Sequence, residues 1–190
     1  MIRTVIIAIR YTIVTTVLVG ILYPLVVTGI AQATMRDKAN GQLIEKDGHV
    51  IGSRIIAQAF TGDGYFHPRP SAAGNGYDAT SSGGTNLGPT NKKLIDRING
   101  DVAAYHKQNP GKDVPIDLVT TSASGLDPDI SPAAALYQVH RIAAARNLSK
   151  DAVENLVEAH VQARQFGVLG EPHVNVLELN LALDGSAKSK

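Results

Sequence analysis

The sequence has 190 residues, with 18 basic and 17 acidic side chains and a formal net charge of +1. This balance excludes the strongly basic surface that is typical of nucleic-acid-binding proteins. There is no cysteine, which excludes a disulfide scaffold, a thiol nucleophile and a zinc site made of thiolates. The hydrophobic fraction of 44% is enough for a packed core, and it is concentrated near the N-terminus.

An uncharged apolar segment lies near the N-terminus, between Tyr11 and Met35. As a helix, residues 11–32 would be about 33 Å long, against a hydrocarbon core of about 30 Å. The sequence therefore predicts a transmembrane helix over 11–32. The alternative is a cleaved signal peptide, with Ala31-Gln32-Ala33 as its cleavage site, but the apolar stretch is longer than the usual 7–15 residues of such signals.

The flanking charges predict the orientation of this segment. Arg3 and Arg10 precede it, whereas Arg36 and Lys38 follow it together with Asp37. By the positive-inside rule, residues 1–10 are expected in the cytoplasm and residues 37–190 outside it. The first 36 residues hold three of the basic residues and no acidic one, so the remainder has a net charge of −2.

A row of mostly small residues recurs every fourth position in the predicted span. Such rows let a second helix approach closely, and close packing is what joins helices in lipid. The proline in the row is also expected to bend the helix. The predicted helix-packing residues are Thr12, Thr16, Gly20, Pro24 and Thr28.

The body begins with features typical of a hairpin and a long loop. Two short apolar stretches, 43–45 and 49–51, flank Asp47-Gly48, a pair that favours a tight hairpin turn. Residues 61–91 hold seven glycines and three prolines, and a loop of this length is usually functional or disordered. Its aromatic residues are expected to anchor it to the body.

The second half of the body shows helical periodicity, followed by an alternating pattern. A helix is predicted over 94–105, stopped by Asn109-Pro110-Gly111. Ser131 and Ser149 are expected to cap two further helices, 132–146 and about 150–165. The alternation of leucines over 174–183 predicts a strand. We therefore expect an α+β body with a small sheet, about three helices and long ordered Gly/Pro-rich loops.

The sequence lacks a P-loop, a Gly-x-Ser-x-Gly elbow and a His-Glu-x-x-His pair. Asp127 and Asp129 could bind a hard cation. The favoured interpretation is structural: the two carboxylates lie just before a predicted helix and complement its dipole. The loop 82–86 could hold an anion, although a tight turn is the simpler interpretation. Gln138 could hydrogen-bond a nucleotide or a partner, or could be an ordinary polar residue of a solvated helix face.

The segment 65–70 mixes aromatic, cationic and rigid residues, Tyr65-Phe66-His67-Pro68-Arg69-Pro70. Two interpretations of this segment are equally compatible with its sequence: a protein-binding edge and a well-packed structural loop. The residues predicted to contact a partner or to tie the loops are Tyr65, Phe66, His67, Arg69, Asn86 and Asp127. No catalytic residue and no metal ligand is predicted.

Several strings in these loops resemble those of a known family, the C subunit of the Kdp-type potassium-transporting ATPase of bacteria and archaea. They are Tyr65-Phe66-His67-Pro68-Arg69-Pro70-Ser71, Ser82-Gly83-Gly84-Thr85-Asn86-Leu87-Gly88-Pro89, Asp117-Leu118-Val119-Thr120, Ser124-Gly125-Leu126-Asp127-Pro128 and Gly170-Glu171-Pro172. The resemblance runs from the N-terminal segment to Asp184. It departs at Asp129, Ala123, Thr85 and His173, where the family pattern has histidine, glycine, serine and arginine. These departures weaken any role that needs a cation or an imidazole at position 129 or 173.

The resemblance implies a non-catalytic accessory subunit of a potassium uptake pump in the bacterial inner membrane, with its body on the periplasmic or extracellular side. The implied partners are a channel-like potassium-binding subunit, a P-type ATPase subunit and a small single-span subunit. ATP and K+ would be used by the complex, and no cofactor is expected on this chain. The family is described as a catalytic chaperone that raises the affinity of the ATPase subunit for ATP, and its proposed nucleotide-sensing glutamine would be Gln138.

Three alternatives to an accessory subunit are considered. One is a solitary membrane-anchored extracytoplasmic binding module, and another is a tethered hydrolase that uses Asp127, Asp129 or His67. A periplasmic solute-binding module would need a deep pocket. If the body faces a cation pathway, Asp63, Asp127 and Asp129 are expected to raise the local potassium concentration.

Overall fold

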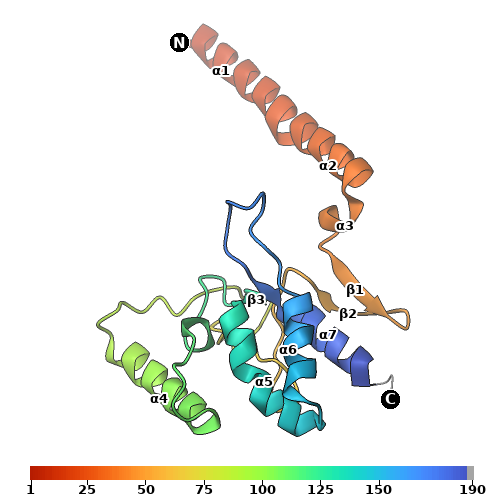
Figure 1. Ribbon diagram of the computed structural model, residues 1–190. Helices are drawn as coiled ribbons and strands as arrows, with labels where there is room; N and C mark the ends of the chain where they lie inside the picture. Colours follow the sequence, from red (N-terminus) through yellow and green to blue (C-terminus); the bar gives the residue numbers. More distant parts are fainter. Residues whose placement is uncertain (188–190) are drawn as a thin grey trace. The chain divides into compact units, whose positions relative to one another are not determined.

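The computed structural model describes residues 1–187, and the side chains of residues up to 185. The chain divides into two compact units, Met1–Val50 and a second unit that begins at Ile51. Figure 1 shows their elements along the chain.

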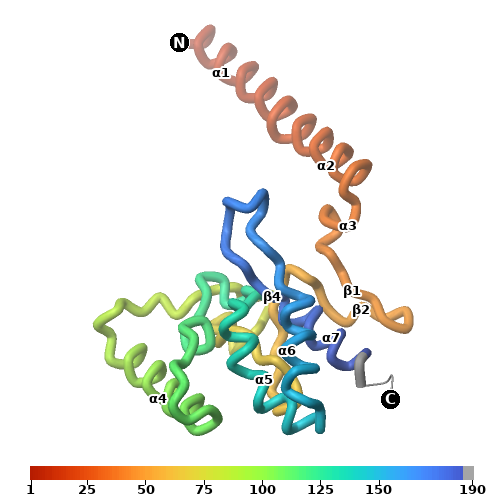
Figure 2. Tube along the Cα trace, in the orientation of Figure 1, coloured from red at the N-terminus to blue at the C-terminus, as the bar shows by residue number. Residues whose placement is uncertain are grey.

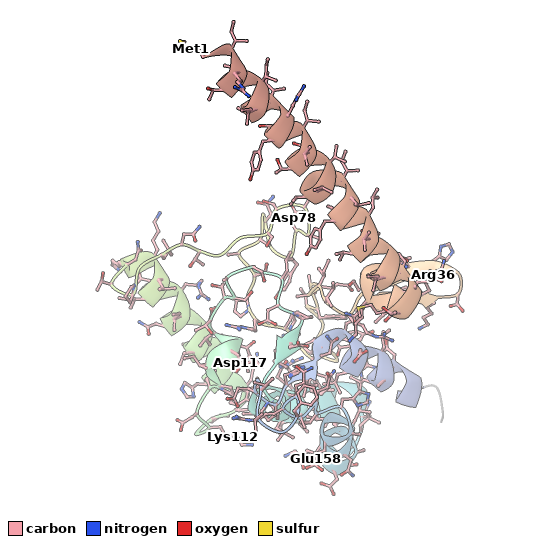
Figure 3. All side chains as sticks on the ribbon, turned by 90° about the horizontal axis from the view of Figure 1, so that it is seen from above. Met1, Arg36, Asp78, Lys112, Asp117 and Glu158 are labelled. Atoms are coloured by element: carbon pink, nitrogen blue, oxygen red, sulfur yellow. The ribbon has the colours of Figure 1, made fainter. Side chains whose placement is uncertain are left out.

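The first unit is dominated by one continuous helix, Ile2–Thr34, which is long and apolar enough to cross a membrane. It consists of α1 (Ile2–Thr15), a π-helical stretch η1 (Thr16–Leu22) and α2 (Tyr23–Thr34). The wider turns lie immediately before Pro24. Because proline has no N–H, the carbonyl four residues earlier loses its usual partner, and a π stretch is one way in which a helix absorbs that loss. The side chains between the labelled Met1 and Arg36 project all round the helix (Figure 3).

A short helix and a hairpin follow the long helix. α3 spans Arg36–Ala39, β1 spans Leu43–Lys46 and β2 spans His49–Ser53, and the two strands form a two-stranded sheet. At the turn, Asp47 and Gly48 have φ values of 54° and 76°. Two successive positive φ angles are typical of the tight turn that matches the twist of a hairpin, so the predicted hairpin is confirmed.

Two of the first three helices of the second unit begin at the predicted caps, Ser131 and Ser149, and the other begins after Asn91. α4 spans Lys92–Gln108, α5 spans Pro132–Arg146 and α6 spans Lys150–Ala159. The side chains of Ser131 and Ser149 accept hydrogen bonds from the third backbone N–H beyond each, at 3.1 and 3.2 Å. These bonds satisfy backbone donors that the first helical turn leaves free.

The core lies between α5, α6 and the C-terminal helix, and the tube in Figure 2 shows α5 beside α6. It is built from alanine, valine, leucine and isoleucine, with Tyr137 from α5 and one phenylalanine from the long loop. Its largest fully buried apolar side chains are Phe66, Leu118, Ile130, Ile142, Leu179, Leu183, Val139, Val153, Val157 and Val174. Phe66 shows how the loop 61–91, which contains no helix or strand, is held to the body.

A second small sheet joins distant parts of the chain. β3 (Asp129–Ile130) pairs antiparallel with β4 (Val174–Asn175), with Asp129 opposite Asn175. A short 3-10 helix, η2 (Ile116–Leu118), precedes this region. The sheet places the loop before α5 beside the segment that leads into the C-terminal helix.

The predicted strand over 174–183 is wrong, because only β4 is extended and α7 (Val176–Ala187) follows it. The side chain of Asn175 accepts from the N–H of Glu178 at 3.2 Å, so asparagine caps a helix that the alternating leucines concealed. Leu179 and Leu183, four residues apart, are both fully buried, which is helical spacing. The expectation of about three helices in the body missed this one.

The predicted extent of the helix after Ser149 is also wrong, since α6 ends at Ala159 instead of about 165. The backbone of Gln162 exchanges two hydrogen bonds with that of His173 (2.8 and 3.1 Å). Residues 162–173 therefore form a projecting hairpin, visible in Figure 2 between α6 and β4. The periodicity of the sequence did not show that the backbone after Ala159 pairs with the segment before β4 of the same chain.

Candidate functional site

The loop segment Phe66–His67 is held between two helices by a pair of buried amides. The N–H of Phe66 donates to Oδ1 of Asn180 at 2.8 Å, and Nδ2 of Asn180 donates back to the carbonyl of Phe66 at 3.0 Å. Gln138 makes the same two bonds to His67, at 2.8 and 3.0 Å. Each side chain thus imitates a neighbouring strand, and together they satisfy the buried polar groups of the loop.

Gln138 is fully engaged within the body. Its side-chain nitrogen also donates to the carbonyl of Ala134 at 3.3 Å, and its oxygen also accepts from Arg141 at 2.7 Å. It is 1% exposed, so it does not lie on the solvated helix face that one interpretation expected. These contacts give it a structural role, and its binding of a nucleotide stays a prediction.

Arg69 ties three parts of the loops together. Its guanidinium donates to Oδ2 of Asp127 at 2.9 Å and to the carbonyls of Thr120 and Thr121, both at 3.3 Å. The Arg69 and Asp127 side chains are 25% and 31% exposed, so solvent only partly screens the pair. The planar guanidinium suits such a set of converging acceptors.

The same loops meet at a glycine. The hydroxyl of Ser71 donates to the carbonyl of Gly125 at 2.6 Å and accepts from the N–H of Tyr77 at 2.7 Å. Gly125 has φ +66°, and a Cβ there would lie 2.6 Å from the backbone nitrogen of Ala73. Only glycine fits this close approach. Burial raises the pKa of Tyr77 to about 12, so its hydroxyl stays protonated and donates to the carbonyl of Arg69 at 2.8 Å.

An open pocket of about 460 Å³ lies beside this junction. Its walls combine acidic residues with one arginine, one histidine and several apolar side chains. They are Arg69, Pro115, Ile116, Asp117, Asp127, Asp129, Ile130, Ser131, Ala133, Glu171, Pro172 and His173. The pocket thus brings Asp127 and Asp129 together, whereas Asp63 lines a different pocket.

The acids of this pocket have distinct environments. Asp117 accepts from the N–H and the hydroxyl of Ser131, at 2.7 and 3.1 Å. Asp129 accepts from Asn175 at 3.1 Å and lies 3.9 Å from the His173 ring. Burial raises the pKa of Asp129, although His173 and Asn175 oppose this shift. Within residues 1–187, no three His, Cys, Asp or Glu side chains are grouped so that they could hold a metal ion.

His67 lies against the start of the loop. Its Nε2 is 3.0 Å from the carbonyl of Gly62, which suits a neutral ring that donates at this nitrogen. Burial, followed by the charge of Arg141, lowers the pKa of His67, while Gly62 and Asp63 oppose this shift. The imidazole is therefore held in its neutral form.

The remaining predicted residues lie in separate places. The ring of Tyr65 packs under the guanidinium of Arg146 at 4.5 Å, and its hydroxyl lies 3.3 Å from Asp184. Asn86 is exposed and has a positive φ of 53°. The five residues of the row in the long helix are all exposed. Sequence reasoning missed Asn180, whose only signal is a polar residue amid leucines.

The fold and the site define a class of protein: an α+β body, tied together by its loop arginines and buried amides, that follows a helix able to span a membrane. The sequence model of the K+-transporting ATPase c chain, KdpC, matches residues 5–185. The chain belongs to this family.

Curated relatives of high identity support this assignment. The chain is 59% identical over 184 residues to the potassium-transporting ATPase KdpC subunit of Koribacter versatilis, covering 97% of this chain and 95% of the relative. It is 58% identical to the subunit of that name from Acidobacterium capsulatum, covering 93% and 95%. The identity to the subunit from Mycobacterium bovis is 56%, again covering 93% and 95%. The chain is therefore similar to subunits of a K+-transporting ATPase along nearly its whole length.

Proposed function

We propose that this chain is a non-catalytic accessory subunit that stabilises the assembly of a high-affinity potassium pump. Its partners are a channel-like potassium-binding subunit, a P-type ATPase subunit and a small single-span subunit, which together bind ATP and K+. The body lies on the periplasmic side of the inner membrane, and the long helix is a single span. The observation that carries this proposal is the family match over residues 5–185.

The long helix supports a role in assembly. None of the residues of α1, η1 and α2 is buried, so most of the surface of the helix is available to lipid or to other helices. A Cβ added to Gly20 would lie 3.7 Å from the Thr16 side chain, so these two residues share one face. Small residues on one face allow the close approach on which helix association in lipid depends.

The body supports a structural role. Three side chains hold its loops in place by hydrogen bonds within the chain. Arg69 binds Asp127, Gln138 binds the backbone of His67, and Asp117 binds the N–H of Ser131. Members of the family are described as raising the affinity of the ATPase subunit for ATP. We infer that this chain does so by assembling with that subunit. Binding of nucleotide by Gln138 remains the alternative, and it would require breaking the bonds to His67.

The test is affinity purification of the tagged chain in mild detergent, followed by mass spectrometry. We expect a P-type ATPase chain and a large multi-span chain to co-elute. Combined substitutions Thr16→Leu and Gly20→Leu should reduce this recovery, whereas Val14→Leu, on another face of the helix, should not. Recovery of the wild-type chain alone in several detergents would contradict the proposal and favour a solitary anchored binding module.

A further inference from the structure

The tip of the projecting hairpin (residues 162–173) presents bulky apolar side chains to solvent. Phe166 is 85% exposed, Val168 is 72% exposed and Leu169 is 55% exposed. Isolated exposed apolar residues are common, but three within four positions of one turn form a patch. We call these three residues the hairpin tip.

The hairpin tip is built on a defined scaffold. Gln165 and Leu169 exchange two backbone hydrogen bonds of 2.9 Å each, and the N–H of Gly167 donates to the carbonyl of Arg164 at 3.0 Å. The side chain of Arg164 pairs with Glu171 on the opposite arm. These bonds hold the two arms of the hairpin together, and such ordering of the backbone lowers the entropy lost when the patch binds.

Phe166 adopts a backbone conformation that does not suit it. Its φ is +55°, in the left-handed region that asparagine and glycine tolerate and bulky residues rarely adopt. Exposure and conformation are thus both unfavourable for this phenyl ring in the isolated chain. Strain of this kind is concentrated at binding sites, which points to a partner that covers the ring.

The tether to the membrane helix restricts the partner. The helix ends at Thr34 and the second unit begins at Ile51, and the 16 residues between them can span at most about 55 Å. A lipid surface and a membrane protein are therefore both within reach of the body, and they are the two candidates weighed for the partner.

The charges near the hairpin favour a protein. The single cation of the hairpin arms, Arg164, is paired with Glu171, so it is not free for an anionic lipid headgroup. Glu171 also lines the 460 Å³ pocket that contains Asp117, Asp127 and Asp129. Anionic lipid would be repelled by this acidic surface, whereas basic residues of a protein would complement it.

We propose that the hairpin tip inserts into an apolar crevice on the extramembrane face of another pump subunit, with basic residues of that subunit facing the acidic pocket. This inference rests on the proposed function. Buried aromatic residues often dominate the affinity of an interface. Phe166 is therefore expected to be the residue of the tip whose loss weakens the complex most.

The first experiment places a photoreactive phenylalanine analogue at position 166 of the full chain within the complex. We expect an irradiated adduct to one of the other pump subunits, identified by mass spectrometry. The same analogue at position 95, where Ile95 is 44% exposed on α4, serves as the control. An adduct to lipid, or no adduct in an intact complex, would overturn the inference.

The second experiment separates docking from folding. Phe166→Asn relieves the backbone conformation and removes the ring, so the Tm of the chain should stay the same or rise while the complex becomes about tenfold or more weaker. Ile95→Asn should leave the complex unchanged. Equal complex stability for Phe166→Asn and the wild type would overturn the inference but leave the proposed function intact, whereas failure of the wild-type chain to form a complex would overturn the proposed function.

Discussion

Replacement of Gln138 by alanine tests the view that this residue holds the loop to the core. In the structure its amide binds both the N–H and the carbonyl of His67, at 2.8 and 3.0 Å, and only 1% of the residue is exposed. Gln138→Ala removes both bonds and leaves two backbone groups without their partners. Water cannot easily replace an amide at a position so shielded from solvent.

The magnitude follows from the cost of leaving a buried donor or acceptor without a partner, which is about 1–3 kcal/mol each. Two such groups give about 2–4 kcal/mol in total if the loop relaxes partly toward solvent. For a body of this size, a loss of 1 kcal/mol lowers Tm by roughly 2–4 °C. We therefore expect Tm to fall by about 4–16 °C.

Thermal unfolding followed by circular dichroism, in detergent, is a suitable assay. The matched control is Gln108→Ala, because Gln108 is exposed on α4, and a surface change of this kind should alter stability by less than about 0.5 kcal/mol. An unchanged Tm for Gln138→Ala would refute the reasoning. If that variant were stable and had also lost ATP binding, the nucleotide prediction would replace the structural one.

Three further predictions concern the loops and the topology. Arg69→Lys should destabilise the body by about 1–3 kcal/mol in denaturant unfolding, since lysine cannot bind Asp127 and two carbonyls at once; stability equal to wild type would contradict this. Because the pKa of His67 is lowered in the folded state, the unfolded chain binds more protons, so stability should fall as pH drops from about 6.5, and His67→Gln should lose this dependence; an identical pH profile for the two would contradict it. In the cysteine-free chain, Lys112→Cys should react with a membrane-impermeant maleimide from outside intact cells, and Thr4→Cys only after permeabilisation, whereas the reverse pattern would contradict the proposed orientation.

The helices with strong local signals were predictable from the sequence. Ser131-Pro132 and Ser149 combine a capping side chain with the start of an apolar periodicity, and the Asp47-Gly48 pair requires little beyond its own conformational preference. These signals are local, so they do not depend on which other segment lies nearby. The apolar segment near the N-terminus was recognisable for the same reason.

The errors arose where distant contacts decide the structure. The leucines of 177–183 alternate like those of a strand, but Leu179 and Leu183 are also four residues apart, which is helical spacing, and Asn175 caps the helix that forms. The early end of α6 depends on the pairing of Gln162 with His173. Likewise, the sequence identified Gln138 as a polar residue, but it did not show that its side-chain amide would hydrogen-bond the backbone of His67.

The central claim is that this chain assembles the pump and does not itself hydrolyse ATP. The most direct test is to purify the complex through a tag on the ATPase subunit, from cells with and without this chain, and to measure K+-stimulated ATP hydrolysis. We predict that without the chain the partner subunits separate and this activity is lost, while the purified chain alone hydrolyses no ATP. An intact complex with full activity in the absence of the chain would contradict the account.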